Sequence, residues 1–110
     1  VTVHDVGLNG AVKIVPVNLD GTNDHFVAYT KDNVMLVVSN TDSSNSLGVK
    51  VLGENGNSDV TFTIKKSETH VIGNLESAKF KDADGNINID LVLVQGASAS
   101  GTIYAIQDLI

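Results

Sequence analysis

Apolar residues recur at every second position in the second half of the chain, a pattern that predicts short β-strands. In residues 60–65, Val60, Phe62 and Ile64 alternate with threonine and lysine. A period of two is typical of a strand with one buried face. Residues 87–94 repeat the alternation and become apolar on both faces near their end. We therefore expect this second strand to lie centrally and to be covered on both faces at that end.

A turn sequence precedes this second strand. Residues 82–86 read Asp-Ala-Asp-Gly-Asn. Aspartate, asparagine and glycine favour tight turns, because their side chains bond the local backbone or because they tolerate positive φ. The pattern predicts a hairpin in which residues 78–81 pair with residues 87–91.

The rest of the chain contains further apolar runs separated by polar turns. The most continuous run, residues 34–38, is expected in the middle of a sheet. Residues 11–17 predict an edge strand or a strand end, since Pro16 cannot donate to a β-ladder. Residues 40–46 are all polar and predict a surface loop with nothing to bury. Further strands are predicted in residues 1–6, 26–29, 47–52 and 102–106.

These runs predict an all-β fold. Their spacing is typical of a single compact β-sandwich or β-barrel of about 8–10 short, mainly antiparallel strands. No segment shows the apolar stripe of an amphipathic helix. We expect residues 1–10 to form an N-terminal arm or edge strand and residues 11–110 to form the β-sandwich domain, which makes a single domain overall.

Composition and charge exclude several classes of function. The chain has 13 acidic residues against 7 basic ones, all lysine, and a formal net charge of -6. Phosphate contacts need a basic face, so no nucleic-acid binding is expected. The absence of cysteine excludes disulfides, thiolate zinc sites and cysteine nucleophiles. No window reaches the roughly 18 apolar residues of a membrane helix, and no signal-peptide pattern opens the sequence. We expect no membrane association.

Two acidic segments invite comparison with a calcium loop. Residues 82–90 place several oxygen ligands on a turn, as calcium requires. However, Gly85 stands fourth in this segment, whereas an EF-hand loop has its glycine sixth and a glutamate twelfth. An acidic hairpin turn is therefore favoured over a metal site, and the same argument applies to residues 20–24.

The histidines and serines form no pattern typical of a metal site or an active site. His4, His25 and His70 are far apart and lack the paired spacing of metal ligands, so histidines at the surface or half-buried on strands are favoured. No Gly-x-Ser-x-Gly elbow occurs. Residues 96–101 lack the lysine and the following helix of a phosphate-binding loop. We expect no catalytic residue, no metal, no cofactor and no enzymatic activity.

Strand-like sequences at both ends of the chain are candidates for contact with a partner. Residues 2–6 and 103–110 could lend or accept an edge strand. The favoured alternative is that both segments complete the sheets of this domain. The apolar end of the chain favours docking as a second interpretation. The candidate contact residues are Thr2, Val3, His4, Val6, Ile103, Ile106, Leu109 and Ile110.

A fixed order of motifs covers residues 11–106. The motifs are Val-Met-Leu-Val-Val-Ser-Asn (34–40), Val-Thr-Phe-Thr-Ile-Lys (60–65), Glu-Thr-His-Val-Ile-Gly (68–73), Ser-Ala-Lys-Phe (77–80) and Asp-Gly-Asn-Ile-Asn-Ile-Asp (84–90). This order resembles a group of small virion structural proteins of tailed bacteriophages and prophages, of the head-decoration or accessory capsid type. Where that group usually has Ala-Gly before Glu-Thr and proline after Ile-Gly, this chain has Lys66-Ser67 and Asn74.

The resemblance implies a non-enzymatic protein that binds the outside of a phage capsid shell and decorates or stabilises it. The implied partner is the major capsid protein or another virion protein, and a homo-oligomer stays open. The implied location is the capsid surface of the virion, after synthesis in the cytoplasm of the bacterial host. No catalytic residue is carried over.

Two alternative functions remain open. One is a phage tail or baseplate accessory protein, which the sequence does not separate from a head protein. The other is a secreted or surface β-sandwich module for adhesion or carbohydrate binding. Sugar-binding modules usually expose tryptophan or tyrosine for stacking. This chain has no tryptophan and only two tyrosines, Tyr29 and Tyr104.

Overall fold

The computed structural model describes residues 1–6, 11–19, 25–27, 33–93 and 99–108 of the chain. These residues form nine strands and one short helix. In chain order the elements are β1 (Val3–Val6), β2 (Val17–Asn18), β3 (His25–Val27), β4 (Asn33–Asn40), β5 (Leu47–Val51), β6 (Val60–Ile64), β7 (Thr69–Glu76), α1 (Ser77–Phe80), β8 (Ile87–Val92) and β9 (Gly101–Asp108).

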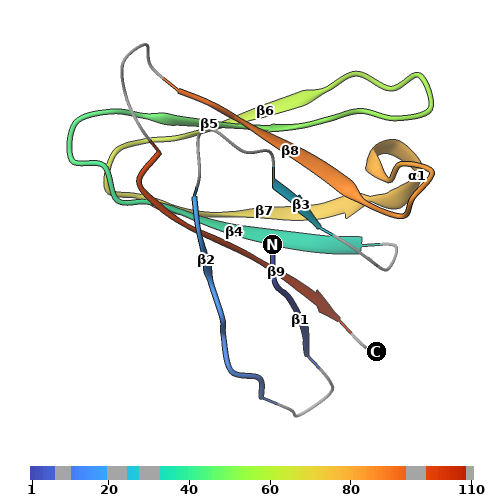
Figure 1. The fold of residues 1–110 in the computed structure, drawn as a ribbon, viewed down its shortest axis with the longest axis horizontal. Coiled ribbons are helices and arrows are strands. Elements are labelled where there is room, and N and C mark those ends of the chain that lie inside the picture. Colours follow the sequence, from blue (N-terminus) through green and yellow to red (C-terminus); the bar gives the residue numbers. More distant parts are fainter. Residues whose placement is uncertain (7–10, 20–24, 28–32, 94–98, 109–110) are drawn as a thin grey trace.

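The strands form two sheets that pack face to face as a β-sandwich (Figure 1). Sheet A has the strand order β1-β9-β4-β7, and β2 also pairs with β9. Sheet B has the order β3-β8-β5-β6. The pairs are antiparallel except that of β1 with β9, which is parallel. The predicted all-β, mainly antiparallel sandwich is confirmed, and the two sheets do not close into a barrel.

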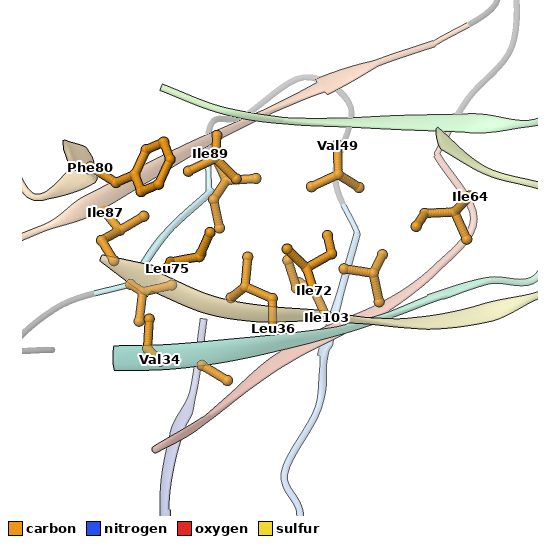
Figure 2. Close-up of a cluster of buried hydrophobic side chains, with 14 of the residues drawn as sticks. Val34, Leu36, Val49, Ile64, Ile72, Leu75, Phe80, Ile87, Ile89 and Ile103 are labelled. Carbon is orange, nitrogen blue, oxygen red and sulfur yellow. The ribbon is translucent and has the colours of Figure 1, made fainter. Parts of the chain in front are cut away.

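The hydrophobic core lies between the two sheets, where alternate residues of each strand point inward (Figure 2). Leu36 and Ile103 enter from sheet A and Ile64, Ile87 and Ile89 from sheet B, and all five are fully buried. Burial of one such side chain contributes about 1.5–3 kcal/mol. The predicted inward faces of β6 and β8 are thus confirmed at Ile64, Ile87 and Ile89.

Two predicted central strands are interior strands of their sheets. β4 lies between β9 and β7, and β8 lies between β3 and β5. The expected cover on both faces at the end of β8 is wrong, because Val92 there is 49% exposed. Val60, expected to face inward, also stays partly exposed, since it begins β6 directly after a turn. Residue 94 lies outside the described residues.

The predicted hairpin before β8 is only half correct. Its turn forms, and the Asp82 N–H donates to the Asn86 carbonyl at 2.8 Å. However, residues 78–80 belong to α1, and only Lys81 bridges to Ile87. The backbone partners of β8 are instead β3 and β5. Alanine and lysine have high helix propensity, and the helical turn delivers Phe80 to the core.

The predicted strand over residues 11–17 is mostly absent. Only Val17 and Asn18 join a sheet, as β2, whereas residues 11–16 form no strand and are exposed. We call residues 11–16 the arm. In Figure 1 the arm runs away from the body of the sandwich toward the bottom of the view. Its sequence is apolar enough for a strand, but the chain supplies no neighbouring strand for it in the described residues.

Other predictions are confirmed within the described residues or fall outside them. The strands expected at residues 1–6, 47–52 and 102–106 are present as β1, β5 and β9. The strand expected at residues 26–29 is present as β3, whose last described residue is Val27. Residues 20–24, 28–29 and 109–110 lie outside the described part of the chain. Within that part, no helix is long and apolar enough to cross a membrane.

Candidate interaction surface on sheet A

The candidate contact residues from the two ends of the chain are brought together by the pairing of β1 with β9. His4 lies opposite Ile106, and the Ala105 N–H donates to the Thr2 carbonyl at 2.9 Å. Ile106 is half-buried, whereas Ile103 is fully buried in the core. The remaining candidates are Val3, which packs against the core, Val6, whose backbone pairs with Asp108 of β9, and Leu109 and Ile110, which lie outside the described residues.

β9 has strand neighbours on both sides. β4 pairs along one side, and β1 and β2 pair along the other. A strand with both edges occupied has no free ladder for a further strand. Residues 3–6 and 101–108 therefore complete a sheet of this domain, which was the favoured alternative. Contact of their side chains with a partner stays a prediction.

His4 joins the arm to sheet A. Its Nε2 lies 2.7 Å from the Val15 nitrogen and its Nδ1 lies 3.0 Å from the Ala105 carbonyl oxygen. Because a backbone N–H can only donate, Nε2 accepts and carries no proton, and the neutral ring donates from Nδ1. The ring also meets Tyr104 edge-on, with centroids 5.5 Å apart.

The burial of His4 was missed by the sequence argument, which favoured histidines at the surface or half-buried on strands. The side chain is only 3% exposed. Its hydrogen-bond partners, Val15 and Ala105, are 11 and 101 residues away. No local sequence signal could have identified this contact, because it depends on the pairing of the two ends of the chain.

The outward face of sheet A is apolar over three neighbouring strands. Val37 on β4 lies opposite Val71 on β7 and Tyr104 on β9, and Met35 lies opposite Ile106. We call these five residues the sheet A surface. They alternate with core residues along each strand, so their side chains point away from the core. None is an acidic or basic residue; Val71 is 63% exposed, Met35, Tyr104 and Ile106 are half-buried, and Val37 is only 7% exposed.

The outward face of sheet B is different in character. Lys50 on β5 lies opposite Thr61 on β6 and Asp90 on β8. Lys50 also approaches the Asp59 carboxylate at 3.8 Å. Charged and hydroxyl side chains thus occupy the centre of this face. The two outer faces therefore differ at their centres, which are apolar on sheet A and polar on sheet B, while Phe26 and Val92 toward the margin of sheet B are 50% and 49% exposed.

The arm adds exposed apolar side chains beside the sheet A surface. Val12, Ile14 and Val15 are 39%, 38% and 50% exposed. The hydrogen bond from Val15 to His4, and the contact of His4 with Tyr104, connect the arm to that surface. Together they form an apolar region on one side of a protein of net charge -6. Exposed apolar regions of this kind are characteristic of interaction sites.

The loop after β4 is a structural turn. Asn40, the last residue of β4, is only 3% exposed, which contradicts the expectation that residues 40–46 bury nothing. The Asn40 Nδ2 donates to the carbonyls of Asn45 and Ile64, and Oδ1 accepts from the Asp42 N–H. The strand carries this side chain inward, and its hydrogen bonds satisfy it there. The Asp42 carboxylate in turn accepts from the backbone N–H groups of Ser44 and Asn45, which lowers the pKa of Asp42.

The acidic turn before β8 is also stabilised by its own hydrogen bonds. The Asp82 carboxylate accepts from the N–H groups of Asn86 and Asp84 and from the Asn88 side chain at 2.8–2.9 Å. These bonds lower the pKa of Asp82, with the Asn86 N–H contributing most. Among the described residues, no cluster of three or more histidines and carboxylates is placed to hold a metal ion.

The fold and its surfaces define an all-β sandwich with an apolar centre on the outer face of sheet A and a projecting arm that exposes apolar side chains. Comparisons with protein-family models, with curated proteins and with solved structures found no match.

Proposed function

We propose that this chain is a non-enzymatic structural protein of a tailed-phage virion that binds the outside of the capsid shell and decorates or stabilises it. The observation that carries the proposal is the unequal character of the centres of the two outer faces, apolar on the sheet A surface and polar around Lys50 and Asp90 on sheet B. The order of motifs in residues 11–106 supports the assignment to a virion.

The physical properties of the chain suit attachment to a repeated surface. A shell presents identical sites at high density, so weak individual contacts can sum to a stable layer. A net charge of -6 keeps the free protein soluble and repels DNA. The proposed contact is made by the sheet A surface, and the major capsid protein or another virion protein provides the partner surface.

The proposal is tested on purified virions from the source of the gene. Mass spectrometry is expected to find the protein in many copies per particle, and cryo-electron microscopy is expected to locate it on the outer capsid lattice. Detection only in the lysate supernatant would refute the proposal. Density restricted to the tail or baseplate would replace it by the accessory-protein alternative.

A pair of variants tests the proposed surface. Val71→Asp places a charge on the sheet A surface, whereas Val92→Asp places the same charge on an exposed valine of sheet B. Both proteins are mixed with shells that lack the decoration and are then sedimented. We expect Val71→Asp to lose binding and Val92→Asp to keep it. Equal binding by the two variants would contradict the use of sheet A.

A further inference from the structure

The arm and the free edge of β7 lie at opposite ends of the same sheet. In the strand order β1-β9-β4-β7, the arm connects to the β9 side through β2, and β7 ends the other side. Within the described residues, β7 pairs with β4 and with no other strand. A surface at one edge and its complement at the opposite edge produce head-to-tail contacts between copies of a chain.

The edge of β7 is open to strand pairing. The Asn40 N–H donates to the Glu68 carbonyl, so Glu68 directs its backbone groups toward β4. Backbone groups alternate between the two sides of an antiparallel strand, and those of Thr69 and Val71 therefore point toward the free edge. β7 contains no lysine or proline, the residues that commonly protect exposed edges. A register irregularity opposite Met35 disturbs the far end of β7, so the open segment is residues 69–72.

The arm has the properties of a strand without a neighbour. It lies outside both sheets (Figure 1), and its apolar Val12 and Ile14 are separated by Lys13. No hydrogen bond joins the backbone of residues 12–14 to another described residue. The bond from Val15 to His4 fixes the base of the arm, and Pro16, which lacks an N–H, ends any ladder there.

The geometry points to a second copy of this chain as the partner of the arm: residues 11–15 of one copy add as a strand to the β7 edge of the next. This pairing satisfies backbone groups on both sides, and Val12 or Ile14 covers the exposed Val71.

The contact is heterologous, so each copy uses its arm on one neighbour and its β7 edge on another. Assembly therefore proceeds to a closed ring or a chain of copies instead of stopping at a two-fold dimer. The inference does not rest on the proposed function, because it concerns the isolated protein. Failure of virion binding and failure of self-assembly are separate results.

The first test is sedimentation velocity of the full chain over a concentration series. We expect an average mass above that of the monomer that rises with concentration. Val12→Asp/Ile14→Asp in the arm and Val71→Lys on the edge are each expected to give monomers. Val92→Asp and Val92→Lys are matched controls, because β8 has neighbours on both sides. A parent chain that stays monomeric at its highest soluble concentration overturns the inference.

A mixing experiment tests the head-to-tail geometry. The arm variant keeps an intact β7 edge and the edge variant keeps an intact arm, so their equimolar mixture can form one contact per pair. We expect a species of two chains and nothing larger. No complex in the mixture, with both variants folded by circular dichroism, would contradict a contact between arm and edge.

Cross-linking provides a test without charge substitutions, because the chain has no cysteine of its own. The double variant Ile14→Cys/Val71→Cys is oxidised under mild conditions and examined by non-reducing electrophoresis. Each disulfide forms with loss of two electrons and two protons to the added oxidant, oxidised glutathione. We expect ladders of linked chains, and far less linkage for Ile14→Cys/Val92→Cys. Equal linkage in the two variants would mean random collision and would overturn the inference.

Discussion

Replacement of His4 by alanine tests the proposed role of this residue in fixing the arm to sheet A. The change removes both hydrogen bonds of the ring and its edge-on contact with Tyr104. Two hydrogen bonds contribute about 1 kcal/mol each in net terms, and an aromatic pair adds about 0.5–1.5 kcal/mol. We therefore expect His4→Ala to lower the free energy of unfolding by about 3 kcal/mol.

The assay is urea unfolding near neutral pH, where the midpoint and slope give the free energy of unfolding. His4→Phe keeps an aromatic ring but has no nitrogen, so it should lose about 2 kcal/mol through the hydrogen bonds alone. His70→Ala is the matched control: its Nε2 lies 3.0 Å from the Glu68 carboxylate at the surface, and exposed contacts of this kind contribute about 0–1 kcal/mol.

Amide hydrogen exchange provides a local measurement of the same contact. The Val15 amide should exchange slowly in the parent chain, because its N–H is held by His4, and faster in His4→Ala. The role assigned to His4 would be refuted by a stability loss no larger than that of His70→Ala. It would also be refuted by an unchanged exchange rate at Val15.

Two further predictions concern the acidic turn before β8 and two glycines with positive φ. Folding lowers the pKa of Asp82 from its unfolded value of 3.8, so the ionised carboxylate stabilises the folded state. This contribution is complete above the unfolded pKa and is lost as the pH falls through the folded pKa. Urea unfolding from neutral to acid pH should show the loss, and Asp82→Asn should reduce the pH dependence. Gly101 has φ 138°, and an added Cβ would overlap the Ser39 carbonyl, whereas Gly56 has φ 82° and open space around it. Thermal unfolding should therefore show a loss of about 1 kcal/mol for Gly56→Ala and a clearly larger loss for Gly101→Ala, and the reverse order would contradict the overlap.

The sequence predicted strands best where burial alone decides them. β4, β5 and the inward positions of β6 and β8 were predicted correctly, because their apolar residues face a single core in a fixed alternation. The hairpin before β8 was predicted partly wrongly. Its turn depends on local hydrogen bonds of Asp82, which sequence shows, whereas the conformation of residues 78–80 depends on how Phe80 reaches the core.

The candidate surface could be predicted only in part. The strand-like sequence of both ends was recognised, and their pairing as β1 and β9 agrees with the favoured alternative that they complete a sheet of this domain. The apolar outer face of sheet A was not anticipated. Val37, Val71 and Tyr104 lie in three strands far apart in sequence, and only the register places them in one row. Single strands with an apolar residue on the outer side give no sign of such a row.

The location of the free edge could not be predicted because edges are a property of strand order. β9 reads as a terminal strand available to a partner, yet β1 and β2 occupy one side of it and β4 the other. β7 contains the Glu-Thr-His-Val-Ile-Gly motif, whose place in a sheet the sequence leaves unspecified, and it ends sheet A. Strand order depends on contacts between distant segments, so the sequence of a strand alone does not show whether it lies at an edge.

His4 connects the strand order of sheet A to the inferred assembly. The arm can add to a second copy at low entropic cost only if its base is already held, because ordering a free segment costs about 1–2 kcal/mol per residue. The hydrogen bond from Val15 to His4 holds that base against β1 and β9. Loss of His4 should therefore weaken self-association even though His4 touches no second copy. In sedimentation, His4→Ala should need a higher concentration than the parent to reach the same average mass. An unchanged concentration dependence would show that the arm binds its neighbour without help from this contact.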